Sequence, residues 1–152
     1  MKNMIVVGGI TAMFTGIFIG IQSLLSGKAG NLIGPVNTGF WTNFLGGSLA
    51  GMIILGITLA KGFDVVGITR PAFGMVLISG TLGIMIIMGI SFSISRAGVA
   101  AGLAAVIWGQ LLFGVISDTY GWGGLEPIPL DLRRVIGLVL MMISVLLLMP
   151  RK

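Results

Sequence analysis

The spacing of the charged residues constrains this chain more than any other feature. Its 152 residues include only nine Lys or Arg and four Asp or Glu, with long apolar stretches between them. Charged residues make up 9% of the sequence, against about 25% in soluble proteins. Uncharged runs of about 20 residues are typical of helices that cross a bilayer. The sequence therefore predicts an all-α integral membrane protein.

Five stretches are candidates for transmembrane helices. Cutting the chain at its charges and at its Pro and Gly clusters gives spans at residues 4–25, 35–60, 71–93, 97–117 and 135–149. Pro35 and Pro71 open the second and third spans, and Pro is favoured at the first position of a helix. The fifth span is short, but basic side chains at both of its ends can reach out to the interface and lengthen it. We expect one transmembrane domain over residues 1–152.

The missing residue types exclude several functions. The sequence has no Cys and no His, so we expect no disulfide, no thiolate or imidazole metal site, and no nucleophile activated by His or Cys. We therefore predict that the protein is not an enzyme and needs no cofactor or metal. The net charge of +5 does not indicate a nucleic-acid partner, because the basic residues stand singly or in pairs at the ends of apolar runs.

The basic residues on the two faces of the membrane are nearly balanced. One face has Lys2, Lys61, Arg70, Arg133 and Arg134, and the other has Lys28, Arg96, Arg151 and Lys152. Lys and Arg in short loops set orientation, so this bias of one charge leaves two interpretations open. Either the amino terminus is cytoplasmic, or the chain inserts both ways and forms an antiparallel homodimer. With five helices, an inverted copy would supply the inverted repeat that larger transporters carry in one chain.

Small residues form stripes along three of the predicted helices. Helices in lipid pack where small residues let their backbones approach, so these stripes predict packing seams. The stripes are Ala12, Gly16 and Gly20; Gly39, Gly46, Gly47 and Ala50; and Gly98, Ala101, Gly102, Ala105 and Gly109.

Three amides lie within the predicted spans: Gln22, Asn43 and Gln110. A polar group in hydrocarbon needs a partner, so each amide either holds two helices together by a hydrogen bond or contacts a substrate. Thr15 shares the face of Gln22 and is a further candidate. Asn43 lies on the side of the Gly39 stripe, where it is expected to face protein.

Two tryptophans and one carboxylate complete the candidate site. Trp41 and Trp108 either pack against lipid and helices or contact the substrate, and each lies about 200° around its helix from the amide two residues later. Asp118 either caps or pairs near the following loop or couples transport to an ion. No charged residue lies in the middle of a span, so uncharged hydrogen-bonding groups would suit a neutral, zwitterionic or amphipathic metabolite.

The fourth span and its loop carry the most specific motifs. These are Gly109–Leu112, Ser117 and Asp118, Gly121, a Pro-containing loop, and Leu132–Arg134 with Gly137. Together with Gln22, Asn43–Gly47 and Gly80–Gly83 elsewhere, their order and spacing resemble the YdcZ-like family, a half-size, five-helix branch of the drug/metabolite transporter superfamily. The family often has an Asn shortly after the first-helix Gln, whereas this sequence has Ser23, Ser26 and, further on, Asn31, so no role of that Asn is carried over.

The resemblance implies a bacterial inner-membrane carrier of small molecules that works as a homodimer, a heterodimer or a fused pair. We predict an exporter that uses alternating access at a site shared between two copies. The alternative is a non-transporting membrane subunit or scaffold of a larger complex, for which the glycine seams would also serve. The resemblance does not identify the substrate.

The charge balance makes orientation testable. A reporter fused to the carboxyl terminus is expected on both sides of the membrane, because one basic residue gives little directional preference. Adding two Lys to either face should place the reporter on a single side, as measured by compartment-specific reporter activity. A reporter confined to one side in the unmodified chain would contradict dual insertion.

Overall fold

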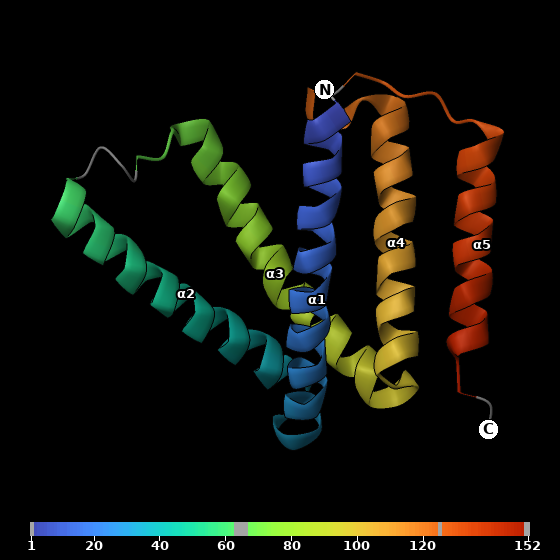
Figure 1. Cartoon of the computed structure of the whole chain (residues 1–152). Coiled ribbons are helices and arrows are strands. Elements are labelled where there is room, and N and C mark those ends of the chain that lie inside the picture. The colour runs from blue at the N-terminus through green and yellow to red at the C-terminus, as the bar shows by residue number, and fades with distance from the viewer. Residues whose placement is uncertain (1, 63–66, 125, 151–152) are drawn as a thin grey trace. The chain divides into compact units, whose positions relative to one another are not determined.

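The computed structural model describes residues 2–62, 67–124 and 126–150, and all of the regular secondary structure in these ranges is helical (Figure 1). Its elements are α1 (Lys2–Ile33), α2 (Pro35–Lys61), α3 (Arg70–Ala97), α4 (Val99–Tyr120), the short 3-10 helix η2 (Trp122–Gly124) and α5 (Leu132–Leu148). The expected all-α fold is confirmed for the described residues.

Four helices of the described chain, α1 to α4, are long and apolar enough to cross a membrane. Helix α5 has 17 residues and is shorter than the roughly 20 that a span needs. A fifth span therefore stays a prediction. Arg151 and Lys152, two of the basic residues expected to lengthen this helix, lie outside the described residues.

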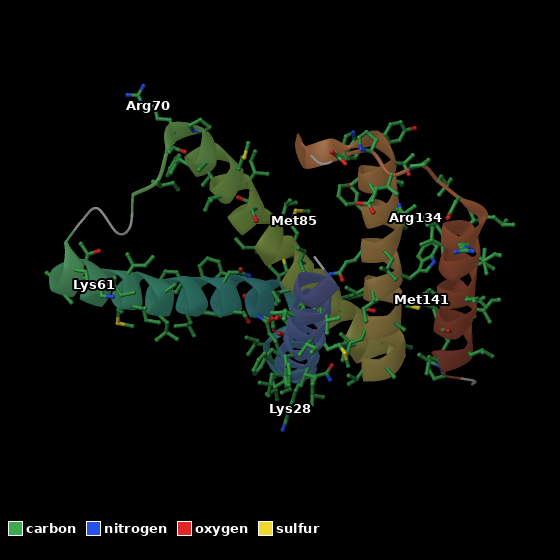
Figure 2. All side chains as sticks on the ribbon, turned by 45° about the horizontal axis from the view of Figure 1, so that its top comes forward. Lys28, Lys61, Arg70, Met85, Arg134 and Met141 are labelled. Carbon is green, nitrogen blue, oxygen red and sulfur yellow. The ribbon has the colours of Figure 1, made fainter. Side chains whose placement is uncertain are left out.

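The first helix continues past its predicted span. The prediction ended at residue 25, whereas α1 runs on through Lys28 to Ile33. It ends where Gly34 takes a φ of 83°, which Gly adopts without steric cost, and Pro35 then opens α2. Figure 2 shows the labelled side chains of Lys28, Lys61 and Arg70 at or near helix ends, where they can anchor the helices at the membrane surface.

The described residues form two compact units. One unit comprises described residues of 1–24 and 93–152, and the other comprises Leu25–Phe92. We call them the terminal unit and the central unit. Whether the whole chain is one transmembrane domain stays a prediction.

The central unit is held together by small residues where its helices meet. The Ser91 hydroxyl of α3 is fully buried and donates a 3.0 Å hydrogen bond to the Ser26 carbonyl of α1. A Cβ at Gly30 would collide with Ser91, and one at Gly39 would collide with Met88, so both glycines permit close helix contacts. Beyond these contacts α2 and α3 diverge toward the connection between them (Figure 1).

The terminal unit contains the antiparallel pair α4 and α5, which lie side by side in Figure 1. Gly98, with a φ of 82°, is the single residue between α3 and α4. This tight connection brings Gly102 against the end of α3. A Cβ at Gly102 would lie 3.1 Å from Ser93 Oγ and 3.2 Å from Ile94 Cγ1.

The predicted glycine seams are thus confirmed at some positions. Gly39 and Gly102 lie in close helix contacts, and Ala101 is buried. By contrast, a Cβ at Gly16 or Gly109 would meet no described atom within 4 Å. Packing at those two positions stays a prediction.

This difference gives a matched pair of substitutions in α4. Gly102→Leu is expected to destabilise the protein by about 1–3 kcal/mol, because the side chain would enter a contact that is already close. Gly109→Leu has open space within the described chain and should leave the protomer's thermal unfolding in detergent unchanged. Equal melting of the two variants would show that Gly102 does not sit in a packed seam.

Candidate substrate site

The predicted site residues fall in both units. The terminal unit contains Thr15, Gln22, Trp108, Gln110 and Asp118, and the central unit contains Trp41 and Asn43. Of these residues, the structure places Asn43 in the wall of a substantial cavity.

That cavity lies between α2 and α3 and has a volume of about 510 Å³, within the range of pockets for small ligands. Its lining residues are Phe40, Asn43, Phe44, Gly46, Gly47 and Ala50 of α2, with Gly80 and Ile84 of α3. We call it the Asn43 cavity. Four of its positions are Gly or Ala, so part of the wall is bare backbone, while Phe40 and Phe44 supply aromatic surface.

Asn43 provides a polar group in this apolar wall. Its Nδ2 donates to the Gly39 carbonyl at 2.9 Å, which satisfies one donor within the helix. The side chain is half-buried, and its Oδ1 lies 3.0 Å from where a Cβ on Gly83 would stand. The predicted position of Asn43 against protein is therefore confirmed. Its amide oxygen is suited to accept a hydrogen bond from a substrate hydroxyl or amine.

Trp41 lies on a different face of α2. It is 46% exposed and packs edge-on against Phe40 and Phe44, with ring centroids 5.5 and 5.9 Å away. Trp41 is not among the lining residues of the Asn43 cavity. Its contribution to that cavity is indirect, through the two phenylalanines that it contacts.

A second cavity of about 510 Å³ adjoins the first along α3. It is lined by Ile68, Phe73, Val76, Leu77, Gly80, Thr81 and Ile84. Gly80 and Ile84 belong to both cavities, so the two are neighbours on the same helix. The Thr81 hydroxyl already donates to the Leu77 carbonyl, which leaves this second cavity almost entirely apolar.

In the terminal unit, Trp108 connects two helices. Its Nε1 donates a 3.1 Å hydrogen bond to the Leu138 carbonyl of α5, and the side chain is half-buried. This contact corresponds to the helix-packing interpretation of Trp108. Substrate contact by Trp108 stays untested.

The remaining polar candidates of the terminal unit are exposed. The Thr15 hydroxyl donates its proton to the Thr11 carbonyl of the same helix, so it can only accept a hydrogen bond from another group. The side chains of Gln22 and Gln110 are exposed in the protomer. Gln110 is near the middle of α4, where an amide needs a partner in hydrocarbon.

Asp118 forms an ion pair near the end of α4. Its Oδ2 lies 3.3 Å from Nη2 of Arg134 at the start of α5. Its carbonyl accepts a 2.8 Å hydrogen bond from the Ile128 amide, which attaches the connecting segment to the end of α4. Asp118 therefore pairs near the loop, as one of its two interpretations predicted. A coupling role stays untested.

Several lining residues were not predicted from the sequence. Phe40 and Phe44 were missed, although their spacing with Asn43 and Gly47 places all four on one helix face. Arg134 was interpreted as a membrane-flanking charge and as part of the family motif, but not as a residue that lines a cavity. Its spacing from Gly137 and Met141 would have indicated a shared face, but nothing in the sequence shows which helix that face meets.

These observations describe a multi-pass membrane protein of the transporter class, with a polar group in the wall of an apolar cavity. The family described as "Putative inner membrane exporter, YdcZ" matches residues 7–147, and the chain belongs to this family. The resemblance inferred from the sequence is thereby confirmed. No curated protein and no solved structure matches the chain.

Family membership and the four membrane-length helices of the described chain locate the protein in the inner membrane as a multi-pass protein. The family is one of transporters rather than enzymes. The partners of this protein therefore include the lipid bilayer and a small-molecule substrate.

Proposed function

We propose that the chain is one half of a small-molecule exporter in which two antiparallel copies operate by alternating access. The substrate is a neutral, zwitterionic or amphipathic metabolite. The Asn43 cavity provides the substrate contact in the central unit. Gln22 and Gln110, with Thr15, Trp41 and Trp108, are proposed to complete the site shared by the two copies.

The observation that carries this proposal is the chemistry of the Asn43 cavity. A volume of about 510 Å³ with aromatic and glycine walls suits a small organic molecule. The Asn43 amide can orient such a molecule without requiring it to carry a net charge. Among the described residues, no charged side chain lines this cavity, which disfavours a fully charged substrate.

Pairing of two copies is supported by the exposed amides. Gln110 lies near the centre of an apolar helix, and its side chain is exposed in the protomer. An amide facing lipid alone would lose the hydrogen bonds that it makes in water. A second copy or a bound substrate would supply the missing partner.

Asn43→Ala tests the cavity, and Asn37→Ala is its matched control. Both side chains donate through Nδ2 to the carbonyl four residues earlier, which is Gly39 of α2 for Asn43, at 2.9 Å, and Ile33 at the end of α1 for Asn37, at 2.8 Å. Only Asn43 lines the cavity. We expect Asn43→Ala to weaken substrate binding by about 1–3 kcal/mol, because the substrate group that it contacts is left unpaired.

The measurement is a solute screen by thermal shift, followed by flux into proteoliposomes with the best solute. Asn37→Ala should bind and transport like the parent protein. Equal losses in both variants would mean that the lost hydrogen bond to the carbonyl four residues earlier, rather than a substrate contact, explains the effect. Unchanged binding in Asn43→Ala would remove the cavity from the substrate site.

Gln110 is tested by two substitutions with different expectations. Gln110→Ala should weaken binding of a polar substrate by about 1–3 kcal/mol. Gln110→Glu introduces a titratable group, so binding should become dependent on pH if the position faces an aqueous cavity. If Gln110 only joins helices, the Glu variant should instead impair assembly, measured by size-exclusion chromatography. Parental affinity and flux in Gln110→Ala would exclude Gln110 from the site.

A further inference from the structure

A second, chemically different cavity lies between α4 and α5 in the terminal unit. It has a volume of about 240 Å³ and is lined by Leu111 and Val115 of α4 and by Arg134, Gly137, Leu138 and Met141 of α5. We call it the α4–α5 groove. It shares no residue with the Asn43 cavity and is independent of the proposed substrate contact.

The groove has one polar end and one apolar end. Arg134 is in the first turn of α5, whereas Met141 lies two turns further along the helix. Figure 2 shows both labelled side chains on the side of α5 toward α4. On α4, Leu111 and Val115 are followed at the same helical spacing by Asp118, the ion-pair partner of Arg134. The polar end is therefore at the end of α4, a helix long and apolar enough to cross a membrane, and we expect it near the lipid headgroups.

The guanidinium of Arg134 has unused hydrogen-bonding capacity. Its Nη2 contacts Asp118, but its Nη1 is buried and has no hydrogen-bond partner among the described residues. A buried donor without an acceptor is unfavourable, and a guanidinium binds phosphate oxygens particularly well. The Arg134 side chain as a whole is 26% exposed, so a modest rotation would turn Nη1 toward a ligand.

Asp118 adds the opposite charge next to this donor. Its side chain is 36% exposed, so the carboxylate can accept hydrogen bonds from a group outside the protein. A cation and an anion 3.3 Å apart complement a headgroup that carries both an anion and a cation. A purely anionic headgroup would be repelled by the carboxylate.

We propose that the α4–α5 groove binds a phospholipid of the surrounding bilayer that has a phosphoethanolamine headgroup. The lipid phosphate contacts the Arg134 guanidinium, and the primary ammonium donates to the Asp118 carboxylate. One acyl chain lies along Leu138 and Met141, where Gly137 leaves room for it. A Cβ at Gly137 would meet no described atom within 4 Å.

The test uses the full-length protein in a non-ionic detergent, with bound lipid measured by native mass spectrometry. Phosphatidylethanolamine, phosphatidylcholine and phosphatidylglycerol with identical acyl chains are added in turn. We expect the ethanolamine lipid to bind roughly tenfold more tightly than the other two, the change expected from one charge-assisted hydrogen bond. Phosphoethanolamine without acyl chains should not bind, which distinguishes a bilayer lipid from a soluble headgroup.

Substitutions at the polar end separate the two headgroup contacts. Arg134→Gln should reduce the binding of ethanolamine and choline lipids alike, because both lose the phosphate contact. Asp118→Asn should reduce ethanolamine-lipid binding to the level of the choline lipid. Arg133→Gln is the matched control, since it removes an adjacent, exposed charge that does not line the groove. It should leave the lipid preference unchanged.

Gly137→Leu keeps the proposal testable if the ion-pair variants do not fold. The new side chain enters open space in the groove and should abolish the lipid preference while the protein melts normally. Gly74→Leu is its control, because Gly74 is also an exposed helical glycine with open space but belongs to α3. Equal binding of the three lipids to the parent protein, or an unchanged preference in Gly137→Leu, would overturn the proposal.

Discussion

The need of polar groups for partners in hydrocarbon organises this structure. Many short polar side chains in the described helices donate to the carbonyl four residues earlier, as Thr11, Thr15, Asn37 and Ser48 do. Such hydroxyls and amides are largely satisfied before any helix meets another. Groups that keep spare hydrogen-bonding capacity, such as the Asn43 amide oxygen and Arg134 Nη1, are the ones available to a substrate, a lipid or a second copy.

Close packing in the protomer depends on a small subset of the glycines. The sequence has 26 Gly, yet only a few lie where a Cβ would meet a neighbouring helix. Gly30 and Gly39 join helices in the central unit, and Gly102 does so in the terminal unit. Other glycines of the predicted stripes, such as Gly16, Gly20 and Gly109, contact no neighbouring helix in the described protomer and leave their helix faces open. An exporter assembled from two copies has a physical use for such surface, since small residues permit helix association between chains as well as within one.

The Asn43 cavity and the α4–α5 groove differ in volume and in the charge of their lining residues, as expected for sites with separate functions. The Asn43 cavity is larger and contains a single uncharged polar side chain, which suits transient contact with a small molecule. The α4–α5 groove is smaller and ends in an ion pair at a helix end, which suits a lipid headgroup. A lipid held there would lie between two helices of the terminal unit.

The sequence by itself determined the helices, because charges, Pro35 and the glycines at the helix ends act locally. It also placed Asn43 and Trp41 on different faces of α2, since residues two apart lie about 200° around a helix. It did not determine which glycines pack. These helices are apolar on all sides, so hydrophobicity carries little information about the face that meets a neighbour. Only tertiary structure paired Asp118 with Arg134 and placed Gly80 and Ile84 of α3 in the same cavity wall as Asn43, because both arrangements depend on contacts between separate helices.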